Sequence, residues 1–223
     1  DIVEYLQPGD VVVVNHTRVL PARLKLKRRT GGAVEVLLLE ERDADQMQWE
    51  ALVRPGGKLS VGEELLDGAG AVMLRIGDRS QAGDTFFVYF AAESQDEVMR
   101  RILEVGEIPL PPYITTALAD QDRYQTVFAH DQKSSAAPTA GLHFTPDLLQ
   151  TLSDQKIDFA RVELVVGLDT FQPIQTDNPL DHKMHTEYYS VSQEVMAKVH
   201  DAKRVVAVGT TAVRALESAA SRH

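Results

Sequence analysis

The sequence predicts an α/β protein whose chain is interrupted by an all-β segment. Residues 11–14 are four consecutive valines, a run of the kind that is buried on both faces of a mainly parallel sheet. Residues 24–92 change to short alternating segments separated by glycines, a pattern typical of a meander that forms a small barrel or sandwich. From residue 146 onward, expected strands alternate with expected helices through short loops, which indicates right-handed βαβ crossovers and a parallel sheet or barrel.

These changes of pattern set the expected domain limits. We expect the α/β domain to comprise 1–23 and 93–223, and the inserted all-β domain to comprise 24–92. Apolar residues at helical spacing lie at both chain ends, Ile2 and Leu6 at the first and Val213 and Leu216 at the second. Because both helical patterns are cut short, we expect the sequence to be part of a longer protein.

After residue 93, the expected elements follow from capping and helix-breaking signals. Ser94 and Glu97 stand at capping-box spacing before a helix, and the prolines of 106–113 indicate a stiff extended connection. Thr145 is a good N-cap, and Pro146 suits the first helical position. The remaining expected elements are helix 146–155, strand 159–166, helix 192–203, strand 204–208 and helix 211–220.

Composition narrows the classes of protein. At 223 residues the chain has room for one large or two small domains, and no apolar run is long enough to span a bilayer. The absence of cysteine excludes disulfides, thiolate metal sites and a cysteine nucleophile, so we expect a cytoplasmic protein. A formal net charge of −10 argues against nonspecific nucleic-acid binding, although 16 acidic and only 7 basic side chains in 30–110 account for most of it.

One short segment is strongly basic. Residues 18–29 contain six arginines and lysines and no acidic residue. Side chains of this kind on one face are suited to follow a phosphate backbone. From the charge pattern alone, the preferred interpretation is a solvated strand edge that stays basic against aggregation.

The run 136–145 is the most informative motif of the chain. Small residues and a proline lead to His143, immediately before a helix start. Small residues let the backbone approach a ligand closely, and the free N–H groups of a helix N-terminus favour anions. The run is therefore interpreted as a binding loop that presents an imidazole. A structural histidine in a tight connection is the alternative.

Three further loops follow expected strands or lie near them: 167–171, 181–187 and 209–211. The second packs His182, His185 and Glu187 into a short span, a set that includes possible zinc ligands. The histidines are spaced i, i+3 behind a proline rather than i, i+4 on a capped helix, so a hydrogen-bonding and acid–base cluster is the preferred interpretation. The Gly-Thr-Thr turn at 209–211 lacks the lysine of a P-loop and the glycines of a dinucleotide fingerprint.

Six ordered blocks together resemble one family. They are residues 15–24, 106–114, 123–127, 136–145, 182–187 and 208–211. In this order, the blocks closely resemble the S-adenosylmethionine:tRNA ribosyltransferase-isomerases of queuosine biosynthesis. The family often has glycine at the position of Asp169 and arginine at that of Gln172, and Lys133–Ser135 replaces a more glycine-containing approach to the binding loop. At these positions the resemblance does not carry over the family's local substrate contacts.

The resemblance implies both a fold and an activity. The fold is a barrel-like α/β catalytic domain interrupted by an inserted β-barrel domain, with parts of the family sequence missing at both ends. The activity is transfer and isomerisation of the ribosyl part of S-adenosylmethionine onto 7-aminomethyl-7-deazaguanine at the tRNA wobble position. Epoxyqueuosine-tRNA, adenine and methionine are the implied products. S-Adenosylmethionine is then a co-substrate, with no prosthetic group and no metal expected.

With that chemistry, the residues have expected roles. His143 is the first candidate for proton transfer, and His185 oriented by Glu187 is the second. Phe144, Phe171 and Tyr124 are candidates to lie against adenine or the sulfonium. The candidates for hydrogen bonds to ribose or methionine are Asn15, Thr17, Thr210 and Thr211, and those for tRNA phosphate or the methionine carboxylate are Arg18 and Arg23. The remaining expected substrate contacts are Pro138, Thr139, Gly141, Asp169 and His182.

The expected partners are a tRNA with a queuosine-type anticodon and S-adenosylmethionine. No membrane partner is expected, and the protein is expected to be a monomer or weak homo-oligomer.

Two other functions compete with this interpretation. One is a metal-dependent hydrolase that uses His143, His182 and His185. The other is a non-enzymatic RNA-binding protein whose β barrel binds the RNA, against which the 6% aromatic content and the acidic charge of that segment speak.

Overall fold

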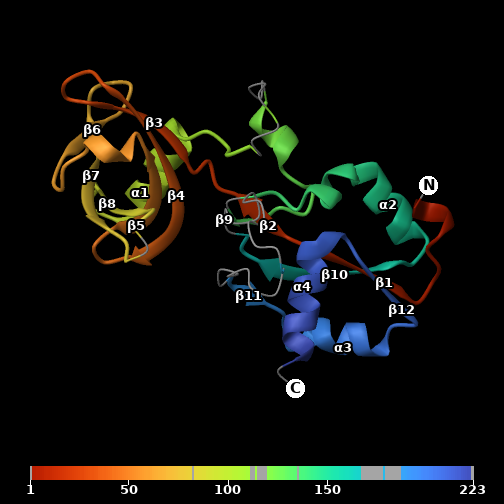
Figure 1. The fold of residues 1–223 in the computed structure, drawn as a ribbon. Helices are drawn as coiled ribbons and strands as arrows, with labels where there is room; N and C mark the ends of the chain where they lie inside the picture. Colours follow the sequence, from red (N-terminus) through yellow and green to blue (C-terminus); the bar gives the residue numbers. More distant parts are fainter. Residues whose placement is uncertain are drawn as a thin grey trace. The chain divides into compact units, whose positions relative to one another are not determined.

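A computed structural model describes residues 2–81, 83–110, 114, 120–134, 136–166, 178 and 187–221. The chain divides into two compact units (Figure 1). The barrel unit is Leu20–Tyr113, and the α/β unit is Asp1–Val19 together with Ile114–His223. The predicted domain limits 1–23, 24–92 and 93–223 stay a prediction.

The barrel unit is a closed, all-antiparallel barrel of six strands. Its strands in sequence order are β3 (Arg23–Arg28), β4 (Ala33–Asp43), β5 (Gln48–Arg54), β6 (Glu64–Leu66), β7 (Val72–Arg79) and β8 (Phe86–Phe90). They are hydrogen-bonded in the order β3-β4-β5-β8-β7-β6. Alternate residues, such as Leu24 and Leu26 of β3, are buried in the barrel core, as period-two strands require. Of the two predicted all-β arrangements, the barrel is therefore the one observed.

β3 is not a sheet edge, which corrects the preferred interpretation of the basic segment. The strand pairs with β4 along Arg23–Lys27 and with β6 at Lys27 and Arg28. At its start, the backbone of Arg23 bonds to that of Glu107 in both directions. Because β3 has a partner strand on each side, it is not an open edge of the sheet, so protection of an edge against aggregation does not explain its charge.

The short 3₁₀ helix η2 (Gly56–Lys58) follows β5, and helix α1 (Gln95–Val105) follows the barrel. The hydroxyl of Ser94 caps α1 by accepting from the backbone N–H of Glu97 at 3.2 Å, as predicted. The carboxylate of Glu97 accepts from the N–H of Glu93 rather than from that of Ser94, so only half of the expected capping box forms. α1 buries Val98 and Ile102 in the same core as the barrel strands.

The α/β unit contains a mixed four-stranded sheet in the order β11-β10-β1-β12. Its strands are β1 (Asp10–Asn15), β10 (Asp158–Leu164), β11 (Tyr189–Ser190) and β12 (Arg204–Ala207). β10 and β12 run parallel to β1 on its two sides, and β11 runs antiparallel to β10. A separate parallel pair joins β2 (Thr17–Val19) to β9 (Asp131–Ser134). The strands described in this unit form open sheets, and no barrel closes among them.

Helices cover both faces of the four-stranded sheet (Figure 1). The helices of this unit are η1 (Ile2–Glu4), η3 (Gln121–Tyr124), η4 (Thr139–His143), α2 (Pro146–Asp154), α3 (Gln193–Asp201) and α4 (Gly209–Ala220), of which α2 covers one face of the sheet and α3 and α4 cover the other. Val12 and Val14 belong to the core beneath α2, whereas Val11 and Val13 belong to the opposite core with residues of α3 and α4. The valine run is therefore buried on both faces, as predicted. The helical pattern at the chain start yields only the single 3₁₀ turn η1.

Candidate functional site

Two of the predicted loops meet at the carboxyl ends of β1 and β12. The N–H of Val208 donates to the carbonyl of Val13 at 2.8 Å and holds the end of β12 beside β1. Gly209 then starts α4 with a φ of +83°, and a Cβ on it would lie 3.1 Å from the Cβ of Ala140 in η4. The structure therefore brings the Gly-Thr-Thr turn against the 136–145 loop. In parallel sheets, this edge is where ligands bind.

The 136–145 loop folds as the tight helix η4. The N–H of Gly141 donates to the carbonyl of Pro138 at 2.8 Å, and that of Phe144 donates to the carbonyl of Gly141 at 3.1 Å. A Cβ on Gly141 would lie only 2.9 Å from Cγ2 of Thr126, so glycine allows a close approach within the protein. Pro138 and Gly141 are buried, whereas Thr139 and His143 are exposed. The first two shape the loop, and the latter two remain available to a ligand.

His143 lies at the wall of a pocket of about 590 Å³. The lining residues are Ile2, Val3, Leu6, Val12, His143, Phe144, Leu148, Val206, Ala207 and Val208. His143 is the one titratable side chain in this set, and the rest is apolar. Phe144 is held edge-on against Phe128, with ring centroids 5.3 Å apart. The pocket thus combines an apolar lining, which includes one aromatic ring, with one imidazole, an arrangement suited to a planar heterocycle that exchanges a proton.

Helix α2 fixes the approach to this pocket. Thr145 caps the helix by accepting from the N–H of Leu148 at 3.1 Å, and Pro146 occupies its first turn, both as predicted. His143 stands two residues before this cap, and Leu148 lines the same pocket. The capping motif that marks the helix in the sequence therefore also sets where the imidazole lies.

Thr210 and Thr211 occupy the first turn of α4. Thr210 is exposed. The Oγ1 atom of Thr211 is buried and has no hydrogen-bond partner within the described part of the chain. No side chain caps α4, because its N-cap residue is Val208. The turn therefore offers backbone N–H groups and hydroxyls next to η4, consistent with the predicted polar contacts.

Asn15 and Thr17 have a different environment from the predicted one. The amide nitrogen of Asn15 donates to the carbonyl of Leu164 at 3.0 Å, and its Oδ1 accepts from the N–H of Leu164 at 3.2 Å and from that of Thr17 at 3.3 Å. Both side chains are buried, at 2% and 1% exposure. These bonds join the ends of β1 and β10 and orient β2. A direct substrate contact by either residue stays a prediction.

The predicted cations and the predicted tyrosine are spread over the structure. Arg18 forms an ion pair with Asp122 at 2.7 Å and is one third exposed. Tyr124 is buried, at 6% exposure. Arg23 belongs to the barrel unit, and its Nε is buried without a hydrogen-bond partner among the described residues. Within the α/β unit, neither Arg18 nor Tyr124 lines the pocket. The ligand contacts of all three residues stay predictions.

Sequence reasoning missed two positioning side chains. The amide of Gln125 bonds to both the N–H and the carbonyl of Val19, each at 2.9 Å, and so anchors the end of β2. Arg214 of α4 forms an ion pair with Glu187, whose side chain is only 9% exposed. Gln125 lies inside one of the motif blocks, which was a usable signal. Nothing in the sequence around Arg214 distinguishes it from a surface arginine.

Four predicted site residues, Asp169, Phe171, His182 and His185, lie outside the described residues. The predicted pairing of His185 with Glu187 and the hydrolase alternative both depend on them. Among the residues that the structure describes, no three His, Cys, Asp or Glu side chains are grouped so that they could hold a metal ion. None of the helices in that part of the chain combines the length and apolar character that crossing a membrane requires.

Comparison with known proteins decides the family. Residues 1–223 match the family described as queuosine biosynthesis protein. The chain belongs to this family. A relative from Moorella thermoacetica is 47% identical over 226 residues, covering 99% of this chain and 65% of its own length. One from Clostridioides difficile is 46% identical over 225 residues, covering 98% of this chain and 64% of its own length. Both are named S-adenosylmethionine:tRNA ribosyltransferase-isomerase.

One solved structure is also similar to this chain in sequence. The S-adenosylmethionine tRNA ribosyltransferase from Thermotoga maritima is 30% identical, with 99% of this chain and 58% of that chain covered and a TM-score of 0.36. The chain thus spans less than two thirds of the length of these relatives. All the described site residues lie within the part that the family match covers.

Proposed function

We propose that the protein containing this chain transfers and isomerises the ribosyl moiety of S-adenosylmethionine onto 7-aminomethyl-7-deazaguanine at the tRNA wobble position. The products are epoxyqueuosine-tRNA, adenine and methionine. The observation that carries the proposal is 47% identity over 99% of the chain to an enzyme named for this reaction. The structure supports it by joining η4 and the start of α4 beside a pocket that contains His143.

The proposed chemistry needs few groups. The sulfonium acidifies the adjacent ribose carbon, so a base removes a proton there, and a neutral aminomethyl group is the nucleophile. Adenine needs a proton as it leaves. We assign the adenine ring to the apolar pocket beside Phe144, with His143 as the proton-transfer group. His185, oriented by Glu187, is the second proton-transfer candidate, and Glu187 is itself held by Arg214.

The polar end of the substrate is assigned to the edge of the sheet. The first turn of α4 and the exposed hydroxyl of Thr210 are the proposed donors to the ribose hydroxyls or the methionine carboxylate. Thr139 lies in η4, which packs against this turn, and is assigned to the same region. Pro138 and Gly141 shape η4 from inside, so their contribution is through the position of Thr139 and His143.

We infer a barrel-like α/β catalytic domain interrupted by the inserted β barrel, within limits close to 24–92. The proposed partners are S-adenosylmethionine and a tRNA with a queuosine-type anticodon. The proposed location is the cytoplasm, and the proposed assembly is a monomer or weak homo-oligomer. Neither a prosthetic group nor a metal is part of the proposed reaction.

The test is turnover with defined substrates. Protein containing the whole chain is incubated with S-adenosylmethionine and tRNA that carries the aminomethyl-deazaguanine base, while adenine, methionine and the nucleoside mass are measured. We expect equimolar adenine and methionine, together with a ribosyl-derived gain in nucleoside mass. His143→Ala and His143→Gln should lower the rate by about 10²–10⁴-fold, the usual contribution of a general acid or base. His200→Ala, which removes an exposed imidazole of α3, is the matched control.

Two results would count against the proposal. If the folded protein with intact tRNA releases no adenine, the assigned reaction is wrong. If adenine release persists in His143→Ala at the rate of His200→Ala, the reaction stands but the role of His143 does not.

A further inference from the structure

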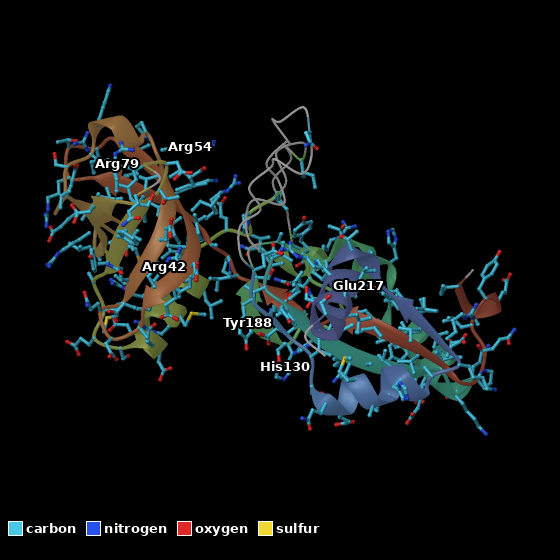
Figure 2. The ribbon with its side chains drawn as sticks, turned by 60° about the horizontal axis from the view of Figure 1, so that its bottom comes forward. Arg42, Arg54, Arg79, His130, Tyr188 and Glu217 are labelled. Atoms are coloured by element: carbon cyan, nitrogen blue, oxygen red, sulfur yellow. The ribbon has the colours of Figure 1, made fainter. Side chains whose placement is uncertain are left out.

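The two ends of the barrel carry different charge. One end is formed by the β3–β4 turn, the β5–β6 connection and the β7–β8 turn. Besides Arg28 and Arg29, which pair with glutamates, four cations lie on it or close to it: Lys27, Arg54, Lys58 and Arg79. We call this the basic end. The β4–β5 hairpin lies at the other end and carries Glu40, Glu41, Asp43 and Asp45. Figure 2 shows Arg54 and Arg79 together at one end of the barrel and Arg42 of that hairpin away from them.

Strand register and hydrogen bonds place the four cations around Gly56. Arg54 and Lys58 flank it in sequence, and a guanidinium nitrogen of Arg79 donates to the carbonyl of Gly56 at 3.3 Å. Lys27 of β3 pairs with Ala33 of β4. Two residues further along β4, Glu35 pairs with Arg54 of β5. Because neighbouring strands are about 4.8 Å apart and β4 lies between β3 and β5, the strands that carry Lys27 and Arg54 are separated by about 10 Å.

The four cations are not neutralised by the barrel. Within the described barrel residues, none of them forms an ion pair with a carboxylate. Their basic neighbours differ in this respect, because Arg28 pairs with Glu63 at 2.5 Å and Arg29 pairs with Glu64 at 2.5 Å. The carboxylates of Asp78 and Asp84 lie in the same region of sequence, yet neither pairs with the four.

Arg79 is held in place without a counter-charge. Its guanidinium donates to the carbonyl of Gly83 at 2.9 Å and to that of Gly56, and it lies 4.3 Å from the ring centre of Phe86. These contacts fix the direction of the side chain but leave its positive charge available. Lys27, Arg54 and Lys58 are exposed. A fixed guanidinium among exposed cations is suited to bind an anion from solution.

We propose that the basic end of the barrel binds the phosphodiester backbone of RNA, and specifically that of the tRNA substrate, an inference that rests on the proposed function. The exposed cations are spread over about two strand spacings, which suits a repeating array of phosphates. A single small anion would instead be bound by donors that converge on one point. In a chain with a net charge of −10, contact with a polyanion requires a local surplus of positive charge of this kind.

The experiment measures binding of unmodified tRNA transcript over a range of KCl concentrations. The variant Lys27→Gln/Arg54→Gln/Lys58→Gln removes three of the charges and leaves Arg79 and its contacts intact. A control with the same charge change, Arg42→Gln/Arg100→Gln/Lys198→Gln, removes exposed cations that pair with carboxylates elsewhere. Circular dichroism confirms that both variants are folded.

We expect the basic-end variant to reduce the slope of log Kd against log salt by about 2, since each phosphate contact contributes about 0.7–0.9. Its affinity at 0.1 M KCl should fall at least tenfold, against less than threefold for the control. Equal binding by the two variants would overturn the proposal. The rate of adenine release at saturating tRNA separates this inference from the proposed reaction. If the two variants bind tRNA equally and turnover is unchanged, only the proposed RNA surface is refuted. If binding depends on the basic end but no adenine is released, only the proposed reaction is refuted.

Discussion

Substitution of Gly209 by alanine tests whether the contact between η4 and α4 builds the site. At a φ of +83°, an L-residue costs about 1–2 kcal/mol. The new methyl group would lie 3.1 Å from the Cβ of Ala140, closer than ordinary carbon contact, and η4 would have to move by a few tenths of an ångström. The combined loss is about 2 kcal/mol, which lowers the melting temperature of a chain of this size by about 4–8 °C.

The assay is thermal unfolding followed by circular dichroism, with three controls. Gly31→Ala has a similar φ of +88° and open space around the new methyl, so it reports the backbone cost alone. Gly57→Ala has neither constraint and should leave the melting temperature unchanged. Adding Ala140→Gly to Gly209→Ala removes the close contact and should restore the part of the loss that exceeds that of Gly31→Ala. A melting temperature for Gly209→Ala equal to that for Gly57→Ala would refute the reasoning.

Three further outcomes are expected. The hydrogen bond from the Arg204 side chain lowers the pKa of Asp10 below its ordinary value. Arg204→Gln should therefore reduce the melting temperature at neutral pH. The difference in melting temperature between this variant and the unchanged protein should close as the pH falls through the folded-state pKa of Asp10. Arg214→Gln should slow adenine release at least tenfold with unchanged tRNA affinity, because it removes the guanidinium that holds Glu187, and recovery of activity in Arg214→Lys would support a positioning role. Asn15→Ala should cost about 2–3 kcal/mol in urea unfolding, since buried backbone groups lose their partners; a loss below 0.5 kcal/mol would contradict this.

Local patterns predicted the elements well where burial alone determines them. The short alternating segments of 24–92 predicted strands of a small barrel or sandwich, and β3 with its buried Leu24 and Leu26 is one of the barrel strands observed. The valine run predicted a strand buried on both faces. The cap at Thr145 formed at the predicted residue. Each of these depends on neighbours in sequence. α4 instead starts at Gly209, two residues before the predicted start, because glycine adopts the positive φ that brings the chain out of β12.

The site was harder to predict because its contacts join distant segments. Asn15 looked like a free polar side chain at a strand end, yet its partner Leu164 lies 149 residues away. The partner of Glu187, Arg214, lies on a helix with no motif to mark it. The basic segment looked like a strand edge, and only the pairing of β3 on both sides excludes that. Sequence patterns carry no record of such pairings.

The valine strand β1 also sets the order in which the chain can fold during synthesis. Val11 lies opposite Asp158 on one side and Val205 on the other, so both neighbours of β1 are made long after it. The barrel is contiguous within Leu20–Tyr113 and has all its strands much earlier. Until β12 leaves the ribosome, four valines remain an apolar strand without its final partners. This leaves β1 open to aggregation in the nascent chain, although it is among the most buried segments described in the finished protein.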